Sequence, residues 1–332
     1  MTRAAPTRRA VLGAALALPG LAPAVAHGQG RGPDGWPGGR TVSLVLPFAP
    51  GGGTDVVARI LLDVFAEYFG GNFVMEHRPG ATTTVAGRHV ARARPDGLTL
   101  LVGSNSTFAQ APHAFRNPGY DPFTDFTHIS LLFASAYLLV ANPKWQGFGQ
   151  MIEAAKRAPG TLTYGTWGVG STAHLLMLDM NARTGTEMLH VPFNGPAPAL
   201  TEILAGRVDM MFTTYAPARG HVLDGRLRAL AAPHEARLAA MPAVPTLIEL
   251  GLPDFLVSAW WCFSGPAGLP PALAPALDGA IRAAVARPAA QRPIEDFGLL
   301  PLPLGPEALR ERMAKDHRLM GDLMRKAGIT PE

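Results

Sequence analysis

Residues 46–59 read LPFAPGGGTDVVAR, and they set the expectation for the fold around them. An apolar run at 43–46 precedes the glycines, and a stretch with helical apolar spacing follows them. A strand, a glycine loop and a helix in this order are typical of an anion-binding loop, since free N–H groups and the helix dipole attract negative charge. The loop holds no Lys or Arg, and it lacks the G-K-[ST] ending of a nucleotide-binding P-loop. The stretch therefore predicts an anion held by neutral donors.

Similar units recur along the chain and predict an α/β fold. Residues 41–48 are predicted as a strand and 54–69 as a helix, with Thr54 or Asp55 as N-cap and Gly70 as stop. Further strands are predicted at 72–78, 97–105, 137–143, 188–193, 207–215 and 227–232, and further helices at 149–159, 272–286 and 306–327. Residues 161–180 repeat the plan of 41–65, which favours two α/β lobes, each with a parallel sheet and covering helices, and a ligand at the carboxyl ends of the strands.

Four predicted strand-to-helix loops share one chemistry. None contains Lys or Arg, and all are rich in Gly, Ser, Thr or Asn; they are Phe48–Asp55, Gly103–Thr107, Gly165–His174 and Phe193–Pro198. Hydroxyls at Thr54, Ser104, Ser171 and Thr172 add donors, and this pattern suits a carboxylate held by neutral groups. For any single loop, the alternative that these residues only close turns and cap helices stays open.

The N-terminus has the pattern of an export signal. Three arginines precede a short apolar run, and Ala24-Val25-Ala26 forms an A-x-A cleavage site, which predicts a signal at 1–26 removed near Ala26. The stretch TRRAVLG resembles a twin-arginine signal, with ordinary Sec export as the alternative. Residues 27–40 are predicted as a flexible linker.

Composition argues against several classes of function. Without the three arginines of the leader, 26 basic residues face 25 acidic ones, and no Lys/Arg cluster is interleaved with aromatic residues, so nucleic-acid binding is not expected. Cys262 is the single cysteine and lies among aromatic residues, which predicts a core position and no internal disulfide. No C-x-x-C or H-E-x-x-H occurs, and no metal site or cofactor is expected.

Two enzyme patterns are weighed and rejected. Residues 168–173, GVGSTA, fit G-x-G-x-x-A, but Glu187 precedes the next strand, whereas the ribose-binding acid should follow it. No G-x-S-x-G occurs, and His174 at the start of an apolar helix is interpreted as a capping or core histidine. The sequence therefore predicts a protein that is not an enzyme, with an exported α/β hydrolase-like enzyme as the alternative.

Several blocks in series carry a family resemblance. They include EHRPGATTTVAGRHVARARPDGLTLL, YGTWGVGSTAHLLMLDM, HVPFNGPAPALTEILAGRVDMMF and GPAGLPPALAPAL, in addition to 46–59. From about residue 41 onward the chain resembles the extracytoplasmic solute-binding receptors of tripartite tricarboxylate transporters, the Bug proteins. The resemblance implies a periplasmic protein with a two-lobed, type II-like periplasmic-binding-protein fold. It also implies hinge crossovers near 137–142 and 255–262, with lobe 1 at 40–138 plus 260–332 and lobe 2 at 139–259.

The same resemblance implies what such a receptor does. It would hold a small organic carboxylate through backbone amides, hydroxyls and water, and it would deliver this ligand to the membrane subunits of the transporter, as a monomer. A receptor that signals to a membrane sensor is a further alternative. The substrate-binding residues expected from the motifs are Phe48, Ala49, Gly52, Thr54, Ser104, Asn105, Gly170, Ser171, Thr172, Phe193, Asn194 and Asp209.

Two positions need a separate interpretation. Asp55 is negatively charged and would repel an anion, so it is predicted as an N-cap or as a partner of Arg59. The family usually has P-G-A-G-G after its second strand, whereas Thr82, Thr83 and Thr84 stand here where glycines are expected. Threonines make this loop stiffer and bulkier and add hydroxyls, so specificity has shifted if the loop faces the ligand.

Overall fold

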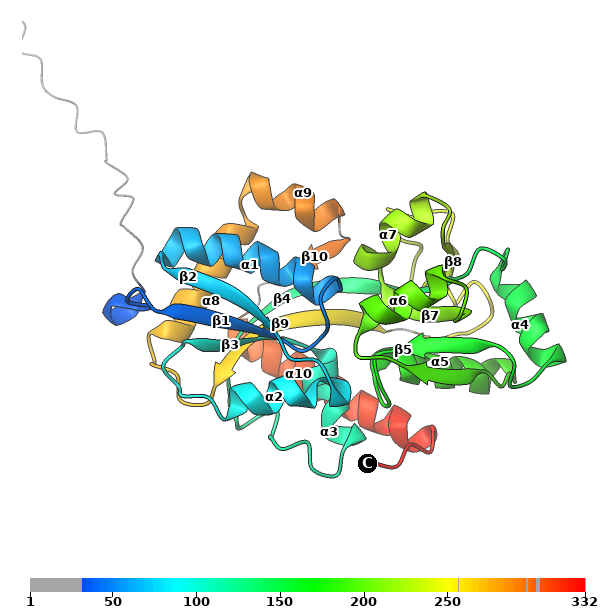
Figure 1. The fold of residues 1–332 in the computed structure, drawn as a ribbon, viewed down its shortest axis with the longest axis horizontal. Helices are drawn as coiled ribbons and strands as arrows, with labels where there is room; N and C mark the ends of the chain where they lie inside the picture. Colours follow the sequence, from blue (N-terminus) through cyan, green and yellow to red (C-terminus); the bar gives the residue numbers. More distant parts are fainter. Residues whose placement is uncertain (1–31, 256, 297, 303–304, 332) are drawn as a thin grey trace, which may run out of the picture.

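The computed structural model describes residues 32–255, 257–296, 298–302 and 305–331. The predicted export signal at 1–26 lies outside these residues. Within them, no helix combines the length and the apolar character that crossing a membrane requires. The chain forms an elongated molecule of two α/β lobes, as expected from the sequence (Figure 1).

The first lobe is built on a mixed sheet. Strands β1 (Thr41–Leu46), β2 (Asn72–His77) and β3 (Thr99–Ser104) are parallel, and β9 (Ser258–Pro266) returns antiparallel to β3. Helices α1 (Gly53–Phe69), α2 (Thr84–Ala91), α8 (Leu273–Val285), α9 (Pro288–Asp296) and α10 (Gly305–Lys326) belong to this part of the molecule, with the short strand β10 (Leu299–Pro301) (Figure 1).

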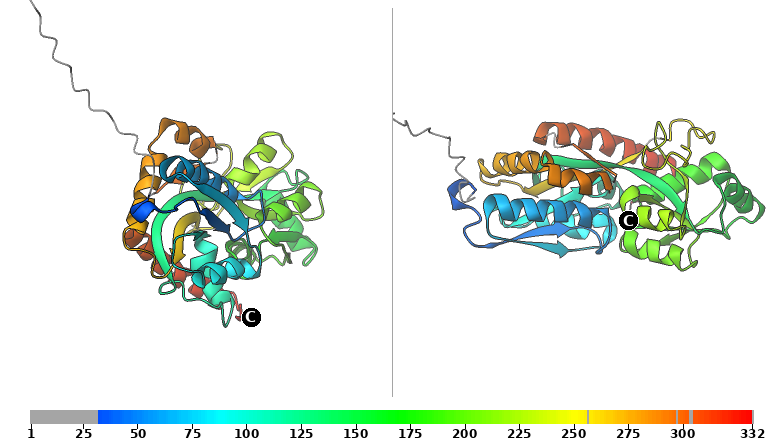
Figure 2. Two further views of the ribbon diagram at one scale, coloured as in Figure 1. Left: turned by 60° about the vertical axis from the view of Figure 1, so that its left-hand side comes forward. Right: turned by 90° about the horizontal axis from the view of Figure 1, so that it is seen from above.

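The second lobe repeats the plan. Parallel strands β5 (Thr163–Thr166), β6 (Leu189–Pro192) and β7 (Met210–Thr214) carry helices α5 (Thr172–Thr184), α6 (Pro196–Leu204) and α7 (Tyr215–Leu223). Helix α4 (Phe148–Arg157) lies at the far end of the molecule (Figure 2). Strand β8 (Arg228–Ala231) pairs with β4 (Phe126–Ala141).

One long strand, β4 (Phe126–Ala141), joins the two lobes. Residues up to Ala136 pair with β9, and residues from Tyr137 onward pair with β7. The sequence analysis predicts this strand only from residue 137, whereas the strand begins at Phe126 and includes the polar residues His128 and Ser130. Both polar side chains at 128 and 130 are buried, and His128 is bonded to Ser264 and to the Pro122 carbonyl. The exact lobe limits given above stay predictions.

The start of α1 differs from expectation. Gly52 is the N-cap residue in an extended conformation, so neither Thr54 nor Asp55 caps the helix, whereas the predicted stop at Gly70 is confirmed. Of the linker predicted at 27–40, the structure describes residues 32–40. Trp36 is only 6% exposed and packs edge-on against Phe69, with ring centroids 5.2 Å apart. The apolar indole therefore ties this segment to lobe 1.

Three short helical segments border the cleft side of lobe 1. They are η2 (Ala81–Thr83), the π-helical turn η3 (Ser106–Gln110) and α3 (Ala111–Ala114). The C-terminal half of α10 packs back against this region and reaches lobe 2, where Met320 and Met324 join Leu175 of α5 in one apolar cluster. The end of the chain thus lies near both lobes (Figure 1).

Candidate ligand-binding site

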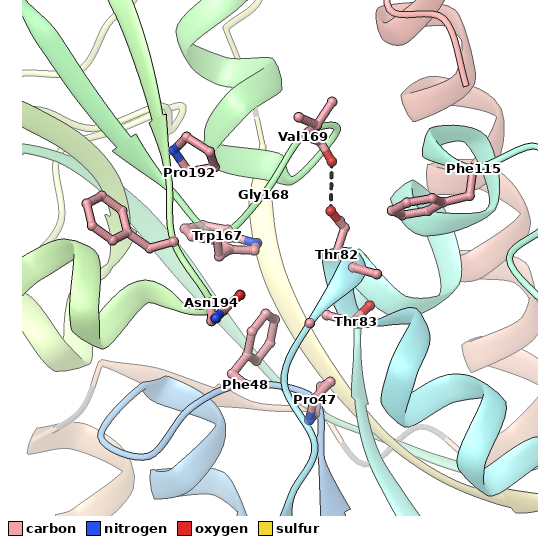
Figure 3. Close-up of a pocket in the computed structure, with 13 residues that line it drawn as sticks. Pro47, Phe48, Thr82, Thr83, Phe115, Trp167, Gly168, Val169, Pro192 and Asn194 are labelled. Atoms are coloured by element: carbon pink, nitrogen blue, oxygen red, sulfur yellow. Dashed lines mark hydrogen bonds between the residues drawn. The ribbon is translucent and has the colours of Figure 1, made fainter. Parts of the chain in front are cut away.

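A cavity of about 300 Å³ lies between the lobes (Figure 3). Lobe 1 contributes the end of β1 and the loop around η2, and lobe 2 contributes the loops after β5 and β6. The lining residues are Pro47, Phe48, Gly80, Ala81, Thr82, Thr83, Phe115, Trp167, Gly168, Val169, Pro192, Phe193 and Asn194. None of these carries a charge, so the cavity presents aromatic faces, hydroxyls, an amide and backbone groups.

A second, smaller cavity of about 30 Å³ lies further in and is also lined by Phe48 and Trp167. We call the two the outer and the inner cavity. The inner cavity is lined by the start of α1, the end of β3 and the end of β7, including Thr54, Ser104, Asn105 and Thr213. Ser104 and Thr213 are 3% and 0% exposed, and neither hydroxyl has a hydrogen-bond partner among the described residues.

The glycine loop before α1 is held in place by Asp55. The Gly51 N–H donates to Asp55 Oδ2 at 2.9 Å, and His77 Nε2 lies 2.9 Å from Oδ1. Trp261 Nε1–H donates to Thr54 Oγ1 at 2.9 Å, which orients that hydroxyl at the edge of the inner cavity. Asp55 therefore supports the loop, and its partners are Gly51 and His77 rather than Arg59.

Replacing Asp55 with alanine is expected to destabilise the protein by about 1–3 kcal/mol, because the Gly51 N–H and the His77 ring then lose a buried acceptor. The midpoint of urea unfolding measures the change. Asp63→Ala is the control, since Asp63 is exposed on the same helix. Equal midpoints for the two variants would contradict the supporting role of Asp55.

The glycine loop after β5 is held by two histidines. Gly170 N–H donates to His174 Nδ1 at 3.1 Å, and Thr166 Oγ1 lies 2.6 Å from His190 Nε2. The Thr166 hydroxyl oxygen also accepts from Gly168 N–H at 3.2 Å. The loop that lines the outer cavity is thus fixed at Gly168 and Gly170 by imidazoles behind it.

The two imidazoles stack with ring centroids 4.0 Å apart. Burial lowers the pKa of His174 to about 3, with a further contribution from the neighbouring His190. Burial likewise lowers the pKa of His190 to about 4. Both rings are therefore neutral near pH 7, and only a neutral His174 leaves Nδ1 free to accept from Gly170. The interpretation of His174 as a capping or core histidine agrees with this geometry.

Hydrogen bonds join the lobes around the cavities. Thr82 Oγ1–H donates to the Val169 carbonyl at 2.8 Å, and Trp167 Nε1–H donates to Ser106 Oγ at 3.2 Å (Figure 3 shows the first of these). Thr172 Oγ1 accepts from Asn105 Nδ2 at 3.0 Å and from Gln110 Nε2 at 2.8 Å. The described conformation is consequently one in which the two lobes are closed on each other.

The threonine loop does face the outer cavity. Ala81, Thr82 and Thr83 have φ values of 43°, 44° and 78°, a left-handed conformation that glycine adopts freely and that threonine adopts at a cost of about 1–3 kcal/mol each. Backbone strain of this kind is concentrated at binding sites. The loop brings two threonine residues to the cavity: Thr82 Oγ1 bonds to lobe 2, and Thr83 Oγ1 has no partner among the described residues.

Most residues predicted for the site lie close to it. Phe48, Phe193 and Asn194 line the outer cavity, while Phe48, Thr54, Ser104 and Asn105 line the inner one. Thr172 joins the lobes, and Gly170 and Ser171 build the loop, with Ser171 Oγ accepting from His174 N–H as the N-cap of α5. Ala49 and Gly52 lie where the lobes meet, beside Gly195 and Pro196.

Asp209 is the exception. It precedes β7, at the amino end of the strand, whereas both cavities lie at carboxyl ends. Its carboxylate accepts from Thr163 N–H at 2.9 Å and pairs with Lys144 at 2.6 Å. The structure therefore gives Asp209 a role in holding β5 to β7 and does not bring it to the site.

Trp167 and Thr213 were missed by the sequence prediction. Trp167 directly follows β5, and Thr213 is the last residue but one of β7. A position at the carboxyl end of a strand could have indicated that both residues belong to the site. The Trp167 indole lies inside the glycine-containing stretch TWGVG, and the Thr213 hydroxyl lies inside β7 rather than in a loop ahead of a helix.

Two α/β lobes joined by a long shared strand, with uncharged cavities between them, define the class of two-lobed solute-binding proteins. The model of the tripartite tricarboxylate transporter family receptor matches residues 57–328, and the chain belongs to this family. The resemblance described from the sequence is thereby confirmed.

Named relatives agree with this assignment. Protein BugT of Bordetella pertussis is 30% identical over 322 residues, which cover 96% of this chain and 97% of BugT. Among solved structures, the periplasmic binding protein BugD has a TM-score of 0.85 and 30% identity, with 88% of this chain and 99% of that chain covered.

Two further structures were determined with ligands. Rpa4515 of R. palustris with adipate has a TM-score of 0.86 and 28% identity, covering 90% of this chain and 100% of that one. MatC from Rhodopseudomonas palustris with bound malate has a TM-score of 0.81 and 31% identity, covering 86% of this chain and 98% of that one.

Proposed function

We propose that this protein captures a small organic carboxylate between its lobes and delivers it to the membrane subunits of a tripartite tricarboxylate transporter. It acts in the periplasm, as a monomer and without a cofactor. The observation that carries the proposal is the uncharged outer cavity between the lobes, bordered by hydroxyls, an amide and a glycine loop.

Neutral donors are sufficient for an anionic ligand. A hydrogen bond to a charged group contributes about 1.5–3 kcal/mol, and several together reach roughly micromolar affinity after ordering costs. Adipate and malate, the ligands of two structures similar to this chain, are both small organic carboxylates.

The hydrolase alternative finds little support in the geometry. Thr166 and His190 form a hydroxyl–imidazole pair at 2.6 Å, as a nucleophile and its base would. Thr166 is fully buried, however, and its hydroxyl is already shared with the backbone of Gly168. A substrate in the outer cavity does not reach that oxygen, so this pair supports the loop.

A thermal-shift screen of the mature protein tests the proposed ligand class. Malate, adipate and other small organic acids are compared with amino acids and sugars, and a ligand at 100 times its Kd is expected to add about 2.7 kcal/mol to the free energy of unfolding. Asn194→Ala is expected to reduce the shift, because Asn194 lines the outer cavity, whereas Asn72→Ala, at the start of β2, leaves it unchanged. A shift with sugars and none with acids would refute the proposal.

Delivery to a transporter needs its own measurement. Membrane vesicles that contain the transporter subunits are expected to accumulate the labelled acid only when this protein is added. Binding without any effect on accumulation would favour a receptor that reports to a membrane sensor.

A further inference from the structure

The outer and inner cavities share one wall. Phe48 and Trp167 line both of them, Phe48 from lobe 1 and Trp167 from the loop after β5 in lobe 2 (Figure 3). The two cavities therefore meet at these residues, and we call their two aromatic rings the partition.

The indole of Trp167 is fixed in this partition from several sides. It is 7% exposed, lies parallel to the Tyr137 ring at a centroid distance of 6.2 Å, and meets the Phe48 ring edge-on at 6.4 Å. Its Nε1–H donates to Ser106 Oγ across the lobe boundary. The indole is thus held as a rigid wall when the lobes are closed.

The inner cavity is built to receive a polar group. Ser104 and Thr213 line it from opposite lobes, and both hydroxyls are buried without a partner among the described residues. Buried hydroxyls without partners are costly, which makes them strong donors for any group that enters. A volume of about 30 Å³ suits one or two waters or a single terminal carboxylate group, and no larger part of a ligand.

We propose that Trp167 is a specificity-determining residue that ends the ligand site and limits the length of the acid that binds. The inference rests on the proposed carboxylate binding. In the native protein the acid occupies the outer cavity and meets the indole at its inner end. Removal of the indole joins the cavities and opens the Ser104 and Thr213 hydroxyls to the second carboxylate of a longer diacid.

The test measures chain-length preference by calorimetric titration with unbranched dicarboxylates from malonate to suberate. In Trp167→Ala, the best ligand is expected to be longer than in the native protein by at least one methylene. The affinity ratio of the longest to the shortest diacid is expected to rise about tenfold or more, which corresponds to the gain of one or two hydrogen bonds to a carboxylate. Trp167→Leu repeats the measurement with a side chain that keeps apolar contacts in the partition, in case the alanine variant is poorly folded.

Two sets of variants separate the effect of the aromatic wall from the effect of the inner-cavity hydroxyls. Trp167→Phe keeps an aromatic wall but loses the N–H bond to Ser106, and it is expected to retain the native length preference. Adding Ser104→Ala and Thr213→Val to Trp167→Ala is expected to remove the gain for long diacids. A gain that survives these two changes would refute the role of the hydroxyls.

The failure of this inference is distinct from the failure of the proposed function. If the native protein binds diacids but Trp167→Ala and Trp167→Leu keep the same order of preference, Trp167 does not limit ligand length. If neither the native protein nor any variant binds an acid, the proposed carboxylate binding itself is refuted.

Discussion

Replacing Gly168 with alanine is expected to weaken ligand binding about 100-fold. Gly168 has a φ of +125°, a conformation that L residues rarely adopt, and a Cβ there would lie 2.6 Å from Thr82 Oγ1. This clash is removed only if the loop after β5, in lobe 2, moves away from lobe 1. That movement breaks the bond from Thr82 to Val169 and displaces a wall of the outer cavity.

The expected change in Kd follows from the backbone strain at Gly168 and from the lost hydrogen bond between Thr82 and Val169. Backbone strain of about 1–3 kcal/mol and the loss of a hydrogen bond of about 1 kcal/mol together approach the roughly 2.7 kcal/mol that a 100-fold change in Kd represents. The Kd is measured by titration with the acid that gives the largest thermal shift.

Gly185→Ala is the matched control for Gly168→Ala. Gly185 also has a positive φ, +64°, at the C-terminal end of α5, but its Cβ would meet nothing within 4 Å. It therefore carries strain without the clash and is expected to leave the Kd nearly unchanged. The double variant Gly168→Ala with Thr82→Ala should recover part of the binding, because the hydroxyl that clashes is gone. Equal Kd values for the two single variants would overturn the explanation.

The second large effect is a loss of stability in mild acid. The pKa values of His174 and His190 lie at about 3 and about 4 in the folded protein, below the ordinary value of 6.5. Below pH 6.5 the unfolded chain binds protons at these sites while the folded chain does not. The stabilisation from the neutral rings is thus complete above pH 6.5 and is lost as the pH falls toward 4, by about 1.4 kcal/mol per pH unit for His174. The contribution of His190 is smaller, since its ring is partly open to solvent.

Urea unfolding at several pH values between 7 and 4 measures this slope. His174→Gln is expected to flatten it, because the amide oxygen of glutamine accepts from Gly170 N–H and does not titrate in this range. His234→Gln is the control, because His234 is outside the stacked pair; its ring is half-buried and its Nδ1 lies 3.0 Å from the Ala236 carbonyl oxygen. A slope that is the same in the native protein and in His174→Gln would show that the stacked histidines do not govern acid stability.

Much of the candidate site could be predicted from the sequence, because it is formed by loops whose positions follow from the local order of strands and helices. Apolar periodicity located the strands and helices, and the loops after β1, β3, β5 and β6 follow from strand-to-helix order. The hydroxyls of Thr54 and Ser104 are predicted on that basis, whereas Phe48, Asn105, Phe193 and Asn194 are expected from the family motifs. The structure brings all six residues to the cavities.

Where the prediction failed, a partner distant in sequence decided the outcome. Asp55 was expected to act within its own helix, but the strand pairing of β1 with β2 places His77 beside it. Asp209 was carried over from a motif, but its place at the amino end of β7 sets it beside Lys144 and Thr163. Charged groups pair with whatever the sheet topology brings near, and topology is not a local property.

The sequence by itself determined the α/β class, the repeated strand–loop–helix units and the absence of cations from the four loops, because these depend on residue type and spacing along the chain. Tertiary structure alone decided that Trp167 lines two cavities, that Thr82 bonds to Val169, and that the hydroxyls of Ser104 and Thr213 lie on facing lobes without a partner in the described part of the chain. Each of these features is a contact between segments that are far apart in sequence, and such contacts form only when β4 and β9 bring the lobes together.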